Sequence, residues 1–214
     1  MVLDETGMSY IYDSEGNLTS ERNNANRTTN NTYDSKNNLT GTTDESGESY
    51  SAKYDSNGNL LSAKSEQLSN GSDISYDSFG NATTTKNGMI DANGHIVTTS
   101  PYIQSSVGYD STGNYVTSQT DERGKTTTGV IDPASGLTLS TTDANGKTTT
   151  YTYDSASQLL LSAASSGTTI SYGYDAYKRL SSITHNGFSY NFAYDKFGNA
   201  SSVKVGSQTL VSYT

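Results

Sequence analysis

The sequence predicts an all-β chain with essentially no helix, in which tandem antiparallel hairpins form one long, curved, spiralling sheet. Three observations lead to this fold class. A Tyr-Asp-x-x-Gly-Asn-Leu motif returns about every 21 residues, apolar and polar residues alternate between the motifs, and apolar residues are scarce throughout. Self-similarity at such a period is typical of repeat proteins, in which each unit is stabilised mainly by its neighbours.

The low apolar content argues against a conventional central core. Leu, Ile, Val and Phe make up about 15% of the 214 residues, below the level of about 20% at which composition alone begins to indicate disorder. The chain is therefore either a disordered polar polymer or an ordered array. Its 17 Tyr residues favour the array, because Tyr suits a half-exposed sheet whose rings pack while their hydroxyls face water.

The repeat appears without departure from its pattern at Tyr12–Leu18 and Tyr54–Leu60. Degenerate copies begin at Tyr33, Tyr76, Tyr109, Ile131, Tyr153, Tyr174 and Tyr194, with a weak copy at Ile90. We expect a single array over residues 1–214, with about ten units and an irregular unit near 77–108. The residues assigned to the structural motif are Tyr12, Asp13, Gly16, Tyr33, Asp34, Tyr54, Asp55, Gly58, Tyr76, Asp77, Gly80, Tyr109, Asp110, Gly113, Tyr153, Asp154, Tyr174, Asp175, Tyr194, Asp195 and Gly198.

The chemistry of the motif predicts a reverse turn. An Asp carboxylate accepts a hydrogen bond from the N–H two residues on, Gly adopts a positive φ without a Cβ clash, and Asn tolerates the same region. A second class of turn lies between the motifs, at Asp44–Gly47, Asp121–Gly124, Asp143–Gly146 and His185–Gly187. Because Asn-Gly between β-formers is a strong hairpin signal, each unit should contain two strands and two turns.

The alternation within strands predicts one aromatic face and one Ser/Thr/Asn face. In Phe188–Tyr194 the aromatic residues fall on every second position. We expect motif tyrosines of successive units to make cross-strand aromatic contacts worth about 0.2–1 kcal/mol each. Phe188, Tyr190 and Phe192 form a candidate aromatic binding face, for which sheet packing is the default interpretation and carbohydrate or receptor binding the alternative.

Charge and composition restrict the partners. The net charge of −9 would repel nucleic acid and anionic membranes, so neither is an expected partner. The sequence has no Cys and no apolar run long enough for membrane insertion. Its first residues lack a secretory leader and already belong to a repeat that ends at Tyr12–Asp13, so we expect the chain to be a piece of a longer protein.

No residue cluster predicts catalysis, a cofactor or a metal. His95 and His185 fall in turn positions without a partner of metal-ligand spacing. The stretch Asp55–Asn59 has its Gly at the fourth position, whereas a calcium loop of the EF-hand type needs Gly at the sixth and Glu at the twelfth. Nucleophile-elbow and phosphate-loop patterns are absent. A glycan hydrolase would need paired carboxylates on adjacent strands, and the Asp residues lie in turns instead, so we do not expect an enzyme.

The motif at this spacing resembles the YD repeat of bacterial Rhs and wall-associated proteins and of animal teneurins. The resemblance implies a strand ribbon that spirals into a secreted or cell-surface shell, which encapsulates or displays a C-terminal toxin or other cargo. The remainder of its own polypeptide is then the main partner. Ile131–Thr138 and Thr142–Asp154 are similar to variants of Gram-positive bacteria, which implies a place at the cell wall.

Two departures from the family pattern qualify these expectations. Asp132–Pro133 resembles part of the segment at which some shells cleave off their cargo, but repeats continue for about 80 residues beyond it. We therefore interpret it as an ordinary turn. Ten units are also fewer than a closed shell needs, which predicts an open arc whose strand edges allow self-association.

Overall fold

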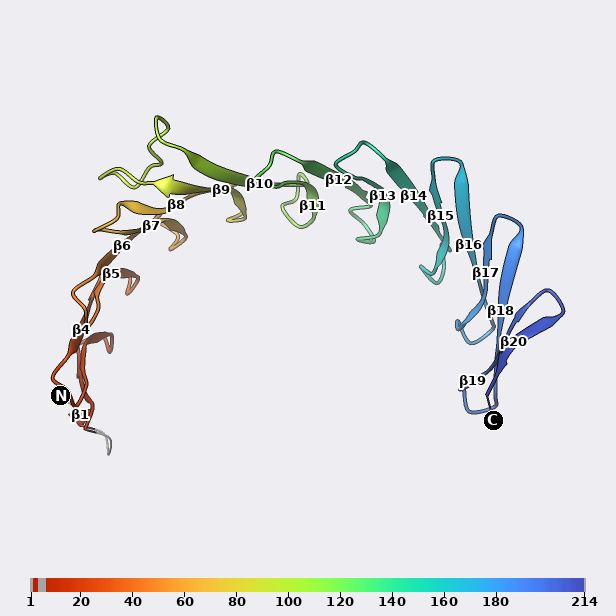
Figure 1. Ribbon diagram of the computed structural model, residues 1–214, viewed down its shortest axis with the longest axis horizontal. Helices are drawn as coiled ribbons and strands as arrows, with labels where there is room; N and C mark the ends of the chain where they lie inside the picture. Colours follow the sequence, from red (N-terminus) through yellow and green to blue (C-terminus); the bar gives the residue numbers. More distant parts are fainter. Residues whose placement is uncertain (1, 4–6, 214) are drawn as a thin grey trace. The chain divides into compact units, whose positions relative to one another are not determined.

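The computed structural model describes residues 2–3 and 7–213, and all regular structure in these residues is β (Figure 1). The chain divides into two units, Met1–Gly113 with Thr120–Gly124, and Asn114–Gln119 with Lys125–Thr214. Within the described residues we find no helix that could cross a membrane. The expected repeat at the start of the chain falls partly outside the described residues, since residues 1 and 4–6 are among those left out.

Unit 1 is an antiparallel sheet in which each strand pairs with its neighbours in the chain. For example, β6 pairs with β7 and β7 with β8. Its strands are β1 (Val2–Leu3), β2 (Ser9–Tyr12), β3 (Leu18–Arg22), β4 (Thr28–Tyr33), β5 (Leu39–Thr43), β6 (Ser49–Tyr54), β7 (Leu60–Ser65), β8 (Asn70–Tyr76), β9 (Ala82–Met89) and β10 (Tyr102–Tyr109).

Unit 2 follows the same plan. The described pairings again run between chain neighbours, from β12 with β13 to β19 with β20. Its strands are β12 (Thr126–Ile131), β13 (Thr138–Thr142), β14 (Thr148–Tyr153), β15 (Leu160–Ser165), β16 (Thr168–Tyr174), β17 (Leu180–His185), β18 (Phe188–Tyr194), β19 (Ala200–Val205) and β20 (Gln208–Ser212), together with residues 116–119 of β11 (Val116–Thr120).

Seven motif tyrosines end their strands at a β-bulge. Lys53 faces Ser62 and Tyr54 faces Leu60, so Leu61 is an extra residue on β7. A bulge of this kind bends the strand and strengthens its twist. The same shift immediately precedes the tyrosine in six further copies, at Tyr12, Tyr33, Tyr76, Tyr153, Tyr174 and Tyr194.

This register shows that the expected cross-strand contact between motif tyrosines is wrong. The partner of Tyr54 is Leu60, and the next motif tyrosine, Tyr76, lies on β8, with β7 between them. The reason is the two-strand unit: motifs recur on every second strand, so one strand always separates them. Each tyrosine therefore faces the first residue after its own turn.

Burial is concentrated around the irregular unit. Among the described residues only Ser62, Ile90, Gly94 and Ile96 are buried, and Ile90 and Ile96 are 3% and 7% exposed. The segment after β9 turns back so that Ile90 and Ile96 pair in an isolated bridge. Elsewhere side chains are half-buried or exposed, as expected for an array with no central core.

The all-β fold class of tandem antiparallel hairpins is confirmed for the described residues. The count of about ten units in one array stays a prediction, as do the spiral and the open arc.

The turn glycine allows a test of this backbone. Gly58 has a φ of 88°, so we expect Gly58→Val to destabilise its hairpin by about 1–3 kcal/mol, because a β-branched residue is strained there. Gly58→Asn is the matched control, since Asn37 holds a φ of 64° at the same motif position of the preceding copy. Hydrogen exchange across Tyr54–Leu60 measures the effect. Equal exchange in the two variants would contradict the turn assignment.

Candidate functional site

The repeated Tyr-Asp turn is the most regular polar site in the molecule. In the copy at Tyr54, Asp55 Oδ1 accepts hydrogen bonds from the N–H groups of Asn57 and Asn59 at 2.8 and 2.9 Å. Asp55 Oδ2 accepts a third from Asn59 Nδ2 at 2.8 Å. The backbone closes the loop, because Asp55 N donates to Asn59 O and Gly58 N to Asp55 O. The carboxylate thus holds a five-residue loop from inside.

These hydrogen bonds stabilise the charged form of the motif carboxylates. The Asn side-chain amide four residues on, followed by backbone N–H groups, holds the pKa of Asp34 and Asp55 below its ordinary value. The pKa of Asp13 is lowered by Asn17 in the same way, against a desolvation effect that opposes the shift. Hydrogen bonding to the charged form is the cause in each case, so these groups are acceptors rather than proton donors at neutral pH.

The second class of turn has largely the same chemistry, which the sequence did not reveal. Asp44 accepts from the N–H groups of Ser46 and Glu48 at 2.8 and 3.0 Å, and Asp143 accepts from Asn145 and Lys147 at 2.9 Å each. Of the four turns expected in this class, Asn186–Gly187 alone forms a two-residue turn, with φ values of 50° and 80°. Ser166–Gly167, between β15 and β16, forms another of the same kind, with φ values of 51° and 78°. His185 is the last residue of β17, facing Phe188, so its expected turn position is wrong.

A second feature, the tyrosine latch, was missed in the sequence. In six copies the motif tyrosine hydroxyl donates to the backbone carbonyl of the first residue after the preceding motif turn. Tyr54 Oη donates to Leu39 O at 2.9 Å, and Leu39 is the cross-strand partner of Tyr33. The other latches are Tyr33 to Leu18, Tyr76 to Leu60, Tyr153 to Thr138 and Tyr174 to Leu160 at 2.9 Å, and Tyr194 to Leu180 at 2.7 Å.

The latch acts where the backbone ladder has ended. Strands β5 and β6 pair from Thr43↔Ser49 to Gly41↔Ser51, and Leu39 and Tyr54 lie beyond that range. The hydroxyl therefore joins two strands at the end where they separate. The expectation of solvated hydroxyls is accordingly wrong for these six tyrosines, because a free carbonyl at the bulge offers a closer acceptor.

Neighbouring turns also contact one another. Asn17 Nδ2 donates to Asn37 Oδ1 at 2.8 Å, and Asn81 Nδ2 donates to Gly113 O at 2.8 Å. Lys36 Nζ donates to the Ser56 carbonyl. The motif Asn thus stabilises its own loop and, in these copies, the next one along the same edge of the sheet.

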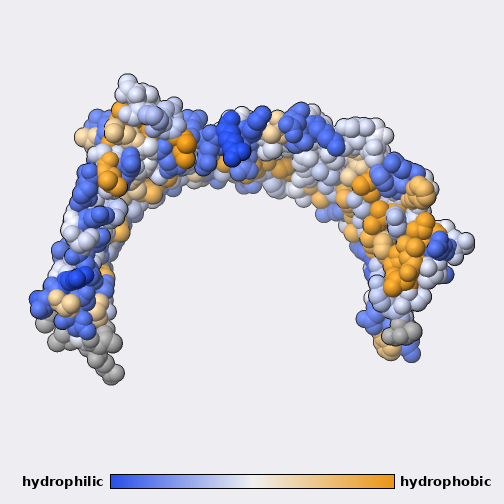
Figure 2. Space-filling view, viewed as in Figure 1, coloured by the Kyte–Doolittle hydropathy of each residue, from blue (hydrophilic) through white to orange (hydrophobic). Residues whose placement is uncertain are grey.

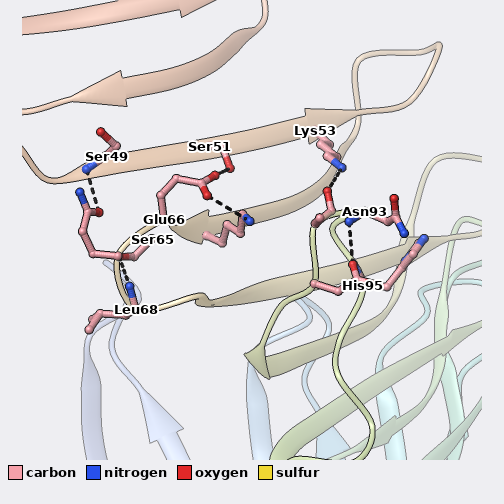
Figure 3. Close-up of polar contacts among 12 residues, drawn as sticks. Ser49, Ser51, Lys53, Ser65, Glu66, Leu68, Asn93 and His95 are labelled. Carbon is pink, nitrogen blue, oxygen red and sulfur yellow. Dashed lines mark hydrogen bonds and ion pairs between the residues drawn. The ribbon is translucent and has the colours of Figure 1, made fainter.

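The irregular unit folds a loop over strands β6 to β8 (Figure 3). Lys53 Nζ donates to Ala92 O at 2.9 Å, and Ile96 N donates to Asp73 Oδ2 at 3.1 Å. Asp91 holds the loop as in the other turns, accepting from the N–H groups of Asn93 and His95. Together with the buried pair Ile90 and Ile96, these contacts make the segment a small local core.

The motif Asp carboxylates that line the hollows between turns accept hydrogen bonds from their own turns. One hollow of about 600 Å³ is lined by Asp13, Glu15 and Asp34, and another of about 270 Å³ by Asp132 and Asp154. The pKa of Asp132 and that of Asp154 are lowered, first by the hydroxyls of Ser135 and Ser157. A glycosidase needs one carboxyl of raised pKa as its acid, and the carboxyls of Asp13, Asp34, Asp132 and Asp154 have lowered values.

His95 and the Asp132–Pro133 pair were examined as possible metal-binding and cleavage positions. His95 is 74% exposed, with Nδ1 3.8 Å from Asp73 Oδ2. The described residues contain no group of three or more His, Asp or Glu able to hold a metal ion. Asp132–Pro133 opens the turn between β12 and β13, closed by Asp132 N donating to Leu137 O at 2.9 Å.

The candidate aromatic face lies on β18. Phe188 and Tyr190 are 64% and 43% exposed, and Phe192 is half-buried. Their cross-strand partners include Ile183 and Val203. The space-filling view shows apolar side chains gathered over the C-terminal strands of unit 2 (Figure 2).

A comparison with protein families matches this repeat of tyrosine latches and Asp-centred turns. The profile of the family described as Teneurin YD-shell matches residues 4–128, more than half of the chain. The chain belongs to the teneurin YD-shell family. A second profile, RHS Repeat, matches residues 132–165. Both agree with the YD-repeat resemblance, and the tyrosine and aspartate of the YD motif are the residues that form the latch and the turn.

Solved structures show a looser likeness. The YD-shell chain is 14% identical to a chain of the Photorhabdus luminescens Tc holotoxin pore with the TccC3 mutation D651A, at a TM-score of 0.38. It is 14% identical to a chain in the crystal structure of TcdB2-TccC3-Cdc42, at 0.37. The matches cover 92% of this chain but only 13% and 14% of those chains. A search of curated proteins gives no match.

Removing the hydroxyl oxygen of one motif tyrosine tests the latch. We expect Tyr54→Phe to destabilise the YD-shell chain by about 0.5–1.5 kcal/mol, the net value of one hydrogen bond, because it removes the bond to Leu39. Tyr177→Phe is the control, since Tyr177 is 80% exposed. Urea denaturation followed by circular dichroism measures both. If Tyr177→Phe costs as much as Tyr54→Phe, the latch does not stabilise the repeat.

Proposed function

We propose that this chain is a non-catalytic wall segment of a secreted YD-shell, which encloses or displays a C-terminal toxin or other cargo of its own polypeptide at the cell surface. Membership of the YD-shell family supports the structural role. The observation that carries the proposal is the use of the motif side chains: the Tyr hydroxyls and Asp carboxylates bind backbone groups of the array itself.

Further parts of this proposal rest on the repeat type alone. An extracellular or secreted place agrees with the teneurin-type repeat. A Gram-positive source, attachment at the cell wall and self-association through open strand edges stay predictions from the sequence, as do the absence of cofactors and of nucleic-acid partners.

Protection of the enclosed segments from a protease tests whether this chain forms part of an enclosing shell. In the natural polypeptide that carries this segment, we expect Tyr33→Ala, Tyr54→Ala and Tyr76→Ala together to open the array, because three latches are lost. Segments beyond residue 214 should then be cut faster by thermolysin, as followed by mass spectrometry. Tyr177→Phe should leave the pattern unchanged. Equal cutting in all forms would overturn the enclosing role.

A second candidate function is carbohydrate or receptor binding through Phe188, Tyr190 and Phe192. The exposure of Phe188 and Tyr190 favours it, because flat aromatic surfaces stack on apolar ring faces. In this case the shell would present an adhesive face.

Calorimetry with neutral cell-wall glycan fragments distinguishes the two functions. Binding through this face should be saturable and should weaken about tenfold or more in Tyr190→Ala with Phe192→Ala, because exposed aromatic anchors dominate such contacts. Assaying the same mixtures for reducing ends tests hydrolysis, and we expect none. Binding that survives the double substitution would exclude this face.

A further inference from the structure

Four neighbouring strands of unit 1 place charged side chains in one row across the sheet. Lys53 on β6 faces Ser62 on β7, and Ser62 faces Asp73 on β8. Asp73 in turn faces Lys86 on β9. Residues that face each other on adjacent strands point to the same side of the sheet, and adjacent strands lie about 4.8 Å apart. We call these four residues the charged row.

The equivalent row in unit 2 consists of hydroxyl side chains. It starts at Thr152, which immediately precedes its motif tyrosine as Lys53 does. It continues across the strands through Ser162, Ser171 and Thr184. The hydroxyls of Thr152 and Ser162 share a hydrogen bond of 2.7 Å. The repeat can therefore build this row without charge, so the hairpins themselves do not require the ionic groups of the charged row.

The loop of the irregular unit is anchored to the charged row (Figure 3). Lys53 Nζ donates to Ala92 O at 2.9 Å, and Ile96 N donates to Asp73 Oδ2 at 3.1 Å. An ammonium has three donors and a carboxylate has two oxygens. Both side chains therefore keep hydrogen-bonding capacity after they have bound the loop.

The other two members of the row have polar groups without a protein partner. A Cβ on Gly94 would lie 2.4 Å from Ser62 Oγ, so the loop crosses directly above Ser62, which is 3% exposed. Among the residues that the structure describes, neither the Ser62 hydroxyl nor the Lys86 ammonium has a hydrogen bond or ion pair. Lys86 faces Asp73 directly, a position at which opposite charges commonly pair. Its charge is thus left for a ligand.

These groups open into one hollow of about 560 Å³, within the range of about 300–1,000 Å³ typical of small-molecule sites. Its lining includes all four members of the charged row together with His95 and the apolar Leu61. The Asp73 side chain is 17% exposed. Two lysines and one aspartate give the row a formal charge of +1, in the order positive, negative, positive.

We propose that the charged row binds a small dicarboxylic amino acid of the glutamate type. The charges of such a ligand follow the complementary order negative, positive, negative. Its α-ammonium pairs with Asp73 and its α-carboxylate with Lys86 on the next strand. Its side-chain carboxylate accepts hydrogen bonds from Ser62 and Lys53 on the other side. Hydrogen bonds between charged groups are the strong ones. A simple dicarboxylate fits less well, because it leaves the charge of Asp73 without a partner. The inference is independent of the proposed shell function.

Titration of the 214-residue chain with L-glutamate, followed by ligand-observed NMR, tests the proposal. Binding should be saturable, and L-glutamine and glutarate should each bind about tenfold more weakly, because one lacks the second carboxylate and the other lacks the ammonium. Lys86→Gln should weaken glutamate binding about tenfold. Lys64→Gln is the matched control and should leave it unchanged, since Lys64 pairs with Glu66 and does not line the hollow.

Asp73→Asn separates recognition of the ammonium from support of the loop. The Asn amide oxygen can still accept from Ile96 N, but the ammonium of glutamate loses its counter-charge and glutarate no longer meets a carboxylate. We expect the preference for glutamate over glutarate to disappear in this variant. Hydrogen exchange over residues 91–97 and circular dichroism verify the loop and the fold of each variant.

Four results would each overturn the proposal. The first is the absence of saturable glutamate binding, and the second is binding of glutamine or glutarate to the unsubstituted chain as tight as that of glutamate. The third is an unchanged preference for glutamate in Asp73→Asn. The fourth is a loss in Lys64→Gln equal to that in Lys86→Gln.

Discussion

The hydrogen bond from a motif tyrosine to a carbonyl of the preceding unit is the contact on which the array depends most. The described strands bury almost no side chain completely, so hydrophobic burial in a core does not hold successive hairpins together. Backbone ladders join adjacent strands, but at the bulged ends they stop short of the motif. The Tyr54 hydroxyl reaches the Leu39 carbonyl of the neighbouring strand β5 at that place. Stability is then a sum of small neighbour terms, as in other repeat proteins.

The turns supply the complementary constraint. A loop that must leave the sheet at the same angle in every unit needs its N–H groups satisfied without a packed interior, and an ionised Asp accepts several of them at once. Asp55 illustrates the result, with three hydrogen bonds from its own loop. Much of the acidic charge of the chain is therefore structural rather than catalytic in its immediate contacts.

Several of these features could be predicted from the sequence, and the exceptions have identifiable causes. The 21-residue spacing and the Asp-Gly-Asn chemistry predicted the hairpins and turns, because both depend on residues close in sequence. The latch was missed because it needs the bulge register, which places Leu39 opposite Tyr33 and in reach of Tyr54. The small core was missed for a similar reason, since Lys53 and Ala92 meet across 39 residues.

The contrast between short-range and long-range contacts also explains why the candidate sites were harder to predict than the fold. The array uses the Tyr, Asp, Gly and Asn side chains or backbone conformations of each turn, whereas of the two intervening positions the second contributes its backbone N–H, as Asn57 does to Asp55. Glu15, Asn57 and Tyr177 occupy one of them in three copies. A motif search therefore treats these positions as unspecified, because their side chains differ from copy to copy.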